Sequence, residues 1–182
     1  MRVLPAFYVD KFPVTNRQYE AFCRDTGYRW PKYWTDARFN GPDHPVVGVS
    51  AADALKYCRW AGKDLPTEEQ WEKAARGTDG RLFPWGNDEP QNGRACCGRD
   101  PTEGATDPVA AHPENKSPFG AMDLAGNVWE WTATTIEDGE TYHVVKGGCY
   151  NDPPTLIRAD VRLEAGPKDK FETIGFRCVK VV

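Results

Sequence analysis

The residues with the clearest capacity for chemistry are one cysteine and two acids in separate glycine-containing stretches. Cys149 lies in "KGGCYNDPPTLIR", residues 146–158, directly after two glycines. A thiol becomes a nucleophile or soft-metal ligand when a cationic neighbour or a helix N-terminus lowers its pKa. Lys146 and Arg158 are the cations nearest to it along the chain. The sequence leaves three roles for Cys149 open: nucleophile, metal ligand, or a small side chain packed beneath a loop.

The second stretch, "MDLAGNVWEW" at residues 122–131, supplies oxygen atoms. Asp123 and Glu130 are seven positions apart, and Gly126 between them lets the backbone turn. Calcium takes carboxylate and backbone carbonyl oxygens at close spacing. The stretch is therefore a candidate calcium loop. The alternative is a plain turn with Trp129 and Trp131 buried and Glu130 bonded to backbone.

The other residues that bind metals in proteins are scattered. His44, His112 and His143 are isolated and no C-x-x-C occurs, so we expect no zinc site of recognisable spacing. Cys96 and Cys97 are adjacent, an arrangement that rarely forms a disulfide because the ring is strained. We expect them to be two thiols on a surface loop.

Composition limits the partners. The 182 residues fit one domain, 1–182, with a net charge of -4. No basic block could neutralise a run of phosphates, and no apolar run is long enough to span a membrane, so we expect neither nucleic acid nor membrane as a partner. The start, "MRVLPAFYVD", lacks the apolar core of a signal peptide. These features favour a cytoplasmic protein, although a segment of a longer secreted protein would look the same.

Three stretches of the first half have the pattern of a capping box at a helix start. In this pattern a Ser or Thr is followed, three residues later, by a polar side chain that bonds back to its backbone N–H. Each stretch also ends near a glycine suited to helix termination. They are residues 13–27 (Thr15, Gln18, Gly27), 49–63 (Ser50, Asp53, Gly62) and 65–77 (Thr67, Gln70, Gly77). We expect three helices, each with one buried face.

The rest of the chain is rich in turn residues. Short strands are expected within residues 6–14, 142–148 and 173–182, with the first and last side by side. The region from residue 77 to 121 is dense in Gly, Pro, Asn and Asp, which predicts loops. Four apolar residues are expected to anchor these loops: Phe83, Trp85, Val109 and Phe119. The sequence thus predicts a single, loop-rich α+β domain.

Taken in order, several segments resemble the formylglycine-generating enzymes, the sulfatase-modifying-factor domain family. They are "FYVDKFPVTNRQYEAF", "HPVVGVS", "YCRWAGKDLPTEEQWEKAARG", "FPWGN", "SPFGAMDLAGNVWEWT", "VKGG" and "TIGFRCV". The resemblance implies a variant of the C-type lectin fold. It also implies several activities on one scaffold: copper-dependent oxidation of a substrate cysteine, a partner domain in iron-dependent sulfoxide synthases, or ligand display without chemistry.

The oxidising members of the resembling family have a pair of cysteines that binds Cu(I), a soft ion suited to thiolates. Those two positions fall on Asp152 and Ile157 here, and the histidine after the first falls on Pro153. Cys149 occupies a position that is usually serine, on the floor of the family's pocket. Copper is therefore not expected.

The resemblance implies calcium ligands more directly. In that family the loop binds Ca²⁺ through the side chain at Asp123, the carbonyls of Gly126 and Val128, and the acid at Glu130. A second calcium site of some members would begin at Cys96 in place of an asparagine, and we expect it to be lost or weakened even if Asp100 compensates in part. Cys58 and Cys178 occupy positions that some secreted members join by a disulfide. We expect neighbouring thiols in a reducing compartment and a bond in an exported protein.

These observations favour a non-catalytic module that binds a protein or small molecule and carries a structural calcium ion. The binding face would comprise loops between 78 and 120 and the segment 149–173. Its candidate residues are Cys149, Trp129 and six that we expect to be exposed or polar on that face: Tyr150, Asn151, Asp152, Thr155, Asp160 and Lys168.

Two further interpretations stay open. The segment before "GFR" could be the variable region of a diversity-generating-retroelement protein, because such proteins use this fold. Alternatively, the chain is an enzyme: a copper-dependent oxidase using Cys149 with a rearranged partner, or the partner domain of an iron-dependent sulfoxide synthase.

Overall fold

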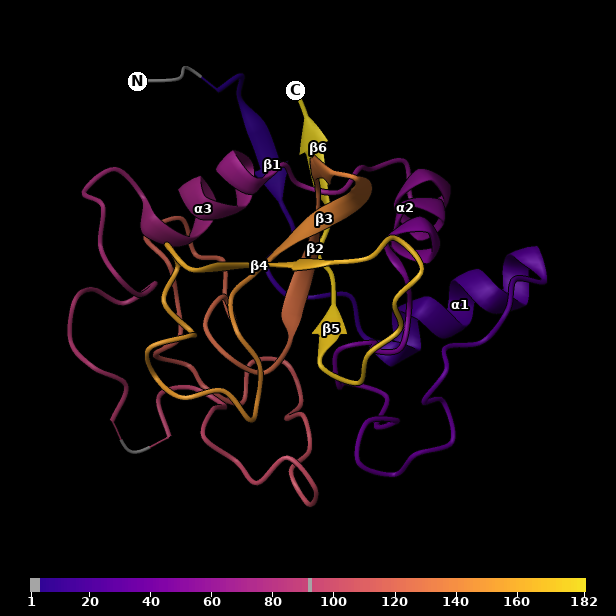
Figure 1. Cartoon of the computed structure of the whole chain (residues 1–182), viewed down its shortest axis with the longest axis horizontal. Helices are drawn as coiled ribbons and strands as arrows, with labels where there is room; N and C mark the ends of the chain where they lie inside the picture. Colours follow the sequence, from indigo (N-terminus) through magenta and orange to yellow (C-terminus); the bar gives the residue numbers. More distant parts are fainter. Residues whose placement is uncertain (1–3, 92) are drawn as a thin grey trace.

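Capping boxes set the starts of the three helices, as the sequence predicts. The computed structural model describes residues 4–91 and 93–182 and contains α1 (Asn16–Thr26), α2 (Ala51–Trp60) and α3 (Glu68–Arg76) (Figure 1). In each helix, the hydroxyl of the N-cap residue accepts a hydrogen bond from the backbone N–H three residues later. The side chain of that later residue in turn accepts one from the N-cap backbone N–H. Gly27, at a φ of 68°, ends α1 in the left-handed conformation that glycine adopts without strain.

Two small sheets accompany the helices. β1 (Phe7–Val9) pairs antiparallel with β6 (Val179–Val181), which confirms that the first and last strands lie side by side (Figure 1). The second sheet has the order β4 (Arg162–Ala165), β3 (Glu140–Lys146), β2 (Trp129–Asp138) and β5 (Ile174–Gly175). In it, β2 pairs antiparallel with β3 and parallel with β5.

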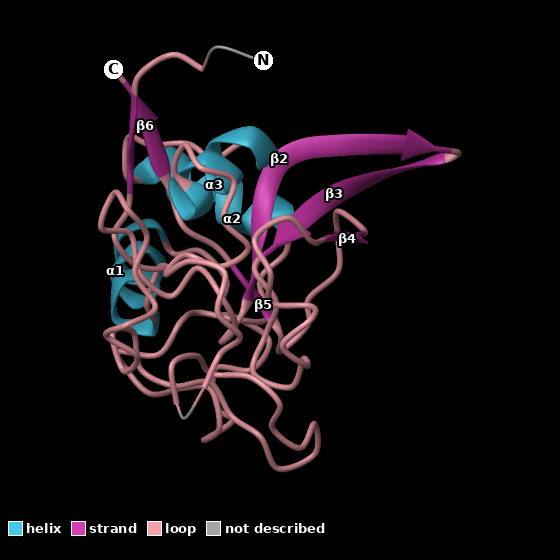
Figure 2. Cartoon of the chain, turned by 90° about the vertical axis from the view of Figure 1, so that its left-hand side faces the viewer, coloured by secondary structure: helices cyan, strands magenta, loops and turns pink. Residues whose placement is uncertain are grey.

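The central strands of that sheet are β2 (Trp129–Asp138) and β3 (Glu140–Lys146), joined in a hairpin at Gly139. The first four residues of β2 are buried, and beyond them the strand alternates and becomes exposed. Figure 2 shows the hairpin extending sideways from the body of the molecule. β3 was predicted from the sequence, whereas β2 and the short β4 (Arg162–Ala165) were not. The start of β2 was predicted as part of a loop, although it is the buried centre of the sheet.

A long irregular region connects α3 to β2, as predicted. Within its described part it forms turns and isolated bridges rather than helices or longer strands. Phe83 is fully buried and stacks on Trp85 with ring centroids 5.0 Å apart, so this part of the loop is anchored to the body. Phe119 is 57% exposed, and its prediction as an anchor is therefore wrong. Its ring instead lies beside the Lys73 ammonium on the surface.

The main core lies between α1, α2 and the inner half of the four-stranded sheet. Tyr19 and Tyr57 stack within it at 5.7 Å, and Phe176, which follows β5, meets both rings edge-on. Aromatic pairs of this geometry stabilise a core beyond the area they bury. None of the helices in residues 4–91 and 93–182 has the length and apolarity needed to cross a membrane.

Candidate functional site

The carboxylate of Glu130, one of the two acids of the candidate calcium loop, lies at the centre of a buried ion pair. It accepts two hydrogen bonds from the Arg177 guanidinium, at 2.7 and 2.8 Å, and a third from the Trp71 indole at 2.7 Å. The side chains of Glu130 and Arg177 are 1% and 0% exposed. Arg177 therefore already neutralises this acid, as a buried carboxylate requires.

Asp123, the other acid of the loop, has less compensation. It is 2% exposed, and one of its oxygens accepts the N–H of Ala110 at 2.8 Å. Burial raises its pKa, against the opposing effects of that hydrogen bond and of the Arg177 charge. The Gly126 carbonyl accepts the N–H of Val128. Of the predicted calcium ligands, Asp123 is thus the one whose charge would gain most from a bound cation.

Cys149 is a packed, protonated thiol rather than a nucleophile. It is 2% exposed, and its Sγ donates to Asn151 Oδ1 at 2.8 Å and Asp152 Oδ2 at 3.0 Å. The same Asp152 oxygen accepts the backbone N–H of Cys149 at 2.9 Å, which closes a tight turn. Burial, followed by the hydrogen bond and charge of Asp152, raises the pKa of the thiol far above its usual value. Neither Lys146 nor Arg158 reverses this effect: Lys146 pairs with acids of α3, and Arg158 pairs with Asp160.

The two positions that the family resemblance aligns with copper ligands, 152 and 157, make structural contacts here. Asp152 holds the Cys149 turn, and Ile157 is fully buried beside Phe83 and Ala125. A Cβ added at Gly148 would lie 2.6 Å from an Ile157 methyl carbon, so these residues are closely packed. The space is therefore occupied by side chains that do not bind soft metals.

Some residues of the predicted binding face are buried in the structure and others are exposed. Tyr150 is fully buried against Phe39, so the expectation that it is exposed is wrong. Trp129 and Cys149 are also core residues. Thr155, Asp160 and Lys168 are exposed, whereas Asn151 and Asp152 are half-buried and bonded to Cys149. What stays available to a partner on this segment is the exposed set Thr155, Asp160 and Lys168.

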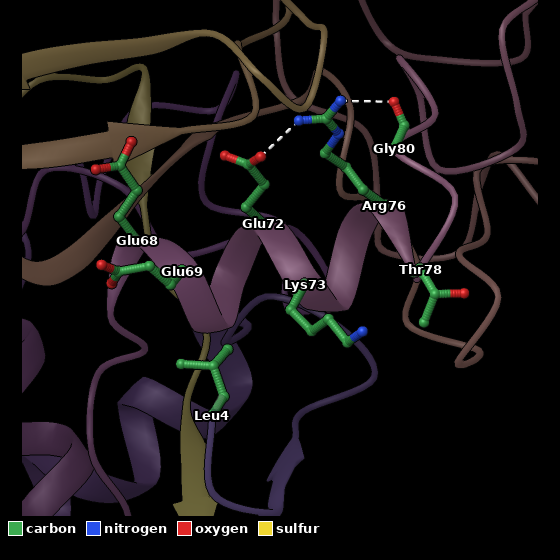
Figure 3. Close-up of a pocket in the computed structure, with 9 residues that line it drawn as sticks. Leu4, Glu68, Glu69, Glu72, Lys73, Arg76, Thr78 and Gly80 are labelled. Atoms are coloured by element: carbon green, nitrogen blue, oxygen red, sulfur yellow. Dashed lines mark hydrogen bonds and ion pairs between the residues drawn. The ribbon is translucent and has the colours of Figure 1, made fainter. Parts of the chain in front are cut away.

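A shallow, open groove lies elsewhere, along the outer side of α3 (Figure 3). It has a volume of about 660 Å³ and is lined by Leu4, Glu68, Glu69, Glu72, Lys73, Arg76, Gly77, Thr78 and Gly80. Much of its charge is already paired. Arg76 binds Glu72 and the Gly80 carbonyl, and the fully buried Lys146 ammonium lies 3.3 Å from Glu72. The groove therefore offers shape but little unpaired charge.

The fold brings together one pair of cysteines and one mixed group that contains a single cysteine. The sulfur atoms of Cys58, on α2, and Cys178, before β6, lie 3.4 Å apart in the core. Their facing arrangement as buried thiols is confirmed. Cys96 is 1% exposed, so its prediction as a surface thiol is wrong. Its sulfur atom is instead grouped with Asp107 and His112, and all three ligand atoms lie within 4.8 Å of one another. Sequence spacing missed this group because its members follow no metal-binding motif.

Comparison with known proteins identifies the family. The sulfatase-modifying factor enzyme 1-like domain profile matches residues 1–182, so the chain belongs to that family. It is 32% identical to the inactive C-alpha-formylglycine-generating enzyme 2 of Mus musculus, over 94% of this chain and 74% of that protein. It is also 32% identical to the formylglycine-generating enzyme of Thermomonospora curvata, over 96% of this chain and 82% of that protein.

Other relatives are longer. Hercynine oxygenase of Mycobacterium tuberculosis is 32% identical over 87% of this chain, which spans 49% of that protein. The chain likewise spans about half the length of a Bacillus subtilis relative, 47%.

Among solved structures, PvdO from Pseudomonas aeruginosa superposes with a TM-score of 0.79 at 25% identity, over 97% of this chain and 80% of that one. Treponema denticola variable protein 1 has a TM-score of 0.76 at 18% identity, over 97% and 84%. The second likeness shows the shared fold alone. Together these structures establish the formylglycine-generating-enzyme type of fold, a mixed α+β domain related to C-type lectins.

Proposed function

We propose that this chain is a non-catalytic binding module built on the formylglycine-generating-enzyme scaffold. One observation carries the proposal: the residues at the copper positions form a packed turn. Ile157 is part of the core, and Asp152 accepts the thiol proton of Cys149. A thiol that donates to a carboxylate and is removed from water lacks the thiolate character that copper binding requires.

An anaerobic Cu(I) titration against a chromophoric chelator tests the proposal. The protein carries a second thiol pair, Cys58 and Cys178, that could hold Cu(I) independently of Cys149. We therefore compare the wild type with Cys149→Ser and with Cys58→Ser. The expected result is that Cys149→Ser leaves copper affinity unchanged. Tight stoichiometric binding that Cys149→Ser abolishes and Cys58→Ser preserves would overturn the proposal and favour a copper-dependent oxidase, to be assayed on cysteine peptides.

The module's surface for a protein or small-molecule partner is proposed to include the exposed residues Thr155, Asp160 and Lys168. Their segment follows the Cys149 turn and is held to the core by Ile157, so it combines a fixed base with accessible polar side chains. A retroelement-diversified segment is a special case of this proposal. The encoding gene would then have a reverse transcriptase and a near-duplicate template repeat beside it.

A calcium ion in the loop at Asp123 is part of the proposal. Its support is the buried carboxylate of Asp123, on which the charge of Arg177 acts although that guanidinium pairs directly with Glu130. The carbonyls of Gly126 and Val128 lie on the same loop and are the oxygen type that calcium accepts. Glu130 would have to share its carboxylate between calcium and Arg177.

A second candidate function is that of a partner domain in a larger enzyme. The observation that favours it is the match to hercynine oxygenase, of which this chain spans 49%. Sequencing the complete gene tests it, because a fused or adjacent helical domain with a histidine-rich motif is the expected result. A gene that encodes this domain without such a neighbour would rule it out.

A further inference from the structure

The structure assigns a transition-metal site, with zinc as its preferred ion, to Cys96, Asp107 and His112. These residues offer one sulfur, one oxygen and one nitrogen atom, all within 4.8 Å of one another. Zinc is bound in proteins by these three atom types at about 2.0–2.3 Å, which places tetrahedral ligand atoms about 3.5 Å apart. Side-chain movements of about 1 Å therefore suffice to close the site.

The histidine is held in the orientation that a metal requires. Its Nδ1 faces the carbonyl of Gly93, which can only accept a hydrogen bond, so Nδ1 carries the proton. Nε2 of a neutral ring then presents its lone pair to the cluster. Hydrogen bonding of the far ring nitrogen to a carbonyl is the common way in which proteins orient a metal-binding histidine.

The contact between His112 and Asp107 requires either a proton or a metal ion between the two atoms. His112 Nε2 lies 2.8 Å from Asp107 Oδ2, and with Nδ1 protonated a neutral ring has only a lone pair to offer there. Two lone pairs at that distance repel each other unless a proton or a metal ion lies between them. Cys96 adds a sulfur atom from the buried side, where its thiol donates to the Ala105 carbonyl at 3.9 Å. Metal binding would displace that thiol proton and make the sulfur a third electron-pair donor. A proton can satisfy only one pair of these atoms, whereas a metal ion satisfies all three.

The backbone around the cluster is fixed independently of any ion. The Cys96 carbonyl accepts the N–H of Asn127 at 2.8 Å, and the Asn127 side chain bonds both the N–H and the carbonyl of Asp107. A Cβ at Gly126 would lie 2.3 Å from the Cys96 carbonyl oxygen, so only glycine permits this close approach. Cys96 and Asp107 are thereby both attached to residues 126–127, so metal binding has less conformational entropy to overcome.

Arg99 is the competing cation. It donates to Asp107 Oδ2 at 2.5 Å and to the Ala105 carbonyl at 2.7 Å. Arg99 and His112 both contact the same oxygen, Oδ2, so metal binding requires the carboxylate to present one oxygen to the ion and the other to Arg99. The combination of thiolate and imidazole favours zinc or another borderline ion over calcium, which takes oxygen ligands alone.

Such an ion would connect distant parts of the long irregular region that joins α3 to β2. Gly93, Cys96, Asp107 and His112 all belong to that region, which has no helix or longer strand in its described part. Long loops of this kind are held by anchors rather than by their own hydrogen bonds. The proposed ion is one more anchor, so metal binding should also raise the unfolding temperature.

The test is a titration of the purified, reduced protein with Zn²⁺ against a chromophoric chelator, repeated with Co²⁺ to observe thiolate-to-metal charge transfer. Cys96→Ser and His112→Gln are the site variants. Cys97→Ser is the matched control, because it removes the neighbouring thiol outside the group, and Cys58→Ser controls for the core thiol pair. Circular dichroism on each variant shows whether it is folded.

We expect one equivalent of Zn²⁺, a Co²⁺ charge-transfer band, and affinity at least about tenfold weaker in both site variants. Both control variants should bind as the wild type does. If Cys96→Ser does not fold, the His112→Gln variant decides: a folded His112→Gln protein with unchanged Zn²⁺ affinity would overturn the assignment. Wild-type protein that does not compete with the chelator for Zn²⁺ would also overturn it. Equal weakening by Cys97→Ser, or loss of binding in Cys58→Ser, would place the metal elsewhere and equally refute it.

Discussion

The buried ion pair of Glu130 with Arg177 gives a quantitative prediction for the variant Glu130→Gln. The amide keeps one oxygen, which can accept from Arg177 Nε and the Trp71 indole as the carboxylate does, at 2.7 Å each. Its nitrogen replaces the oxygen that accepts from Arg177 Nη2 at 2.8 Å, so a donor then faces a donor. The substitution also leaves a guanidinium in the core without its counter-charge.

The magnitude follows from these two losses. One charge-assisted hydrogen bond is worth about 1.5–3 kcal/mol, and breaking a buried ion pair from one side costs about 3–5 kcal/mol in total. Arg177 also donates to the carbonyls of Asp10 and Met122, which solvate part of its charge. We therefore expect a loss of about 3 kcal/mol in the free energy of unfolding. For a domain of this size, that corresponds to a fall in Tm of about 6–12 °C.

The assay is urea unfolding followed by tryptophan fluorescence, run in calcium and in chelator. Glu137→Gln is the matched control, because Glu137 is an exposed carboxylate on the same strand and should change the stability by less than about 0.5 kcal/mol. The loss of about 3 kcal/mol for Glu130→Gln is expected in chelator, where Arg177 is the charged partner of Glu130, and a larger loss is expected in calcium, because the substitution also weakens the proposed calcium site. A loss within about 1 kcal/mol of the control would refute the ion-pair argument. A loss confined to calcium would make Glu130 a calcium ligand first and a partner of Arg177 second.

Two further predictions concern the core and its edge. Mild oxidation should join Cys58 to Cys178, whose sulfur atoms are 3.4 Å apart, and should raise the free energy of unfolding by about 2–4 kcal/mol. Peptide mapping without reductant should find this bond. A Cys58→Ser variant should gain no stability from the oxidant. Asp53→Asn should remove part of the acid sensitivity of the fold. Burial alone would raise the pKa of Asp53, but the Lys170 ammonium and other donors outweigh it and hold that pKa well below 3.8. The stabilisation that ionised Asp53 gives the fold is therefore present above about pH 3.8 and is lost as the pH falls through the lowered pKa. Stability measured from pH 6 down to about pH 2 should fall less steeply in the variant, and an unchanged slope would contradict this assignment.

The helices were predictable because their signals are local. A capping box such as Thr15 with Gln18 satisfies backbone groups of its own first turn, so no distant residue decides where α1 begins. The pairing of the first and last strands was also confirmed, from apolar character at the two ends of the chain. The strand that starts at Trp129 was missed. Its first residues are buried on every side, which removes the alternation by which a strand is recognised.

The residues of the candidate site were harder to predict from the sequence than the helices, because the site depends on which side chains face each other in the folded chain. Asp123 and Glu130 looked equivalent along the chain, yet Arg177, 47 residues after Glu130, bonds the carboxylate of Glu130 and only the backbone carbonyl of Asp123. Tyr150 looked like a face residue but packs into the core against Phe39. Polarity and loop position cannot distinguish such cases, because burial is set by contacts between distant segments.

By itself, the sequence determined the class of fold, the starts of the helices, the loop-rich second half and the family to which the chain belongs. Through the family resemblance it also predicted that Asp152 and Ile157 stand where oxidising members have cysteines. Only the tertiary structure decided the state of Cys149, because a thiol's pKa depends on its burial and on the acceptor it meets. It likewise decided that Cys96, Asp107 and His112 meet. Local sequence fixes which groups a chain carries, whereas their ionisation and their capacity to bind a metal depend on neighbours that only folding brings together.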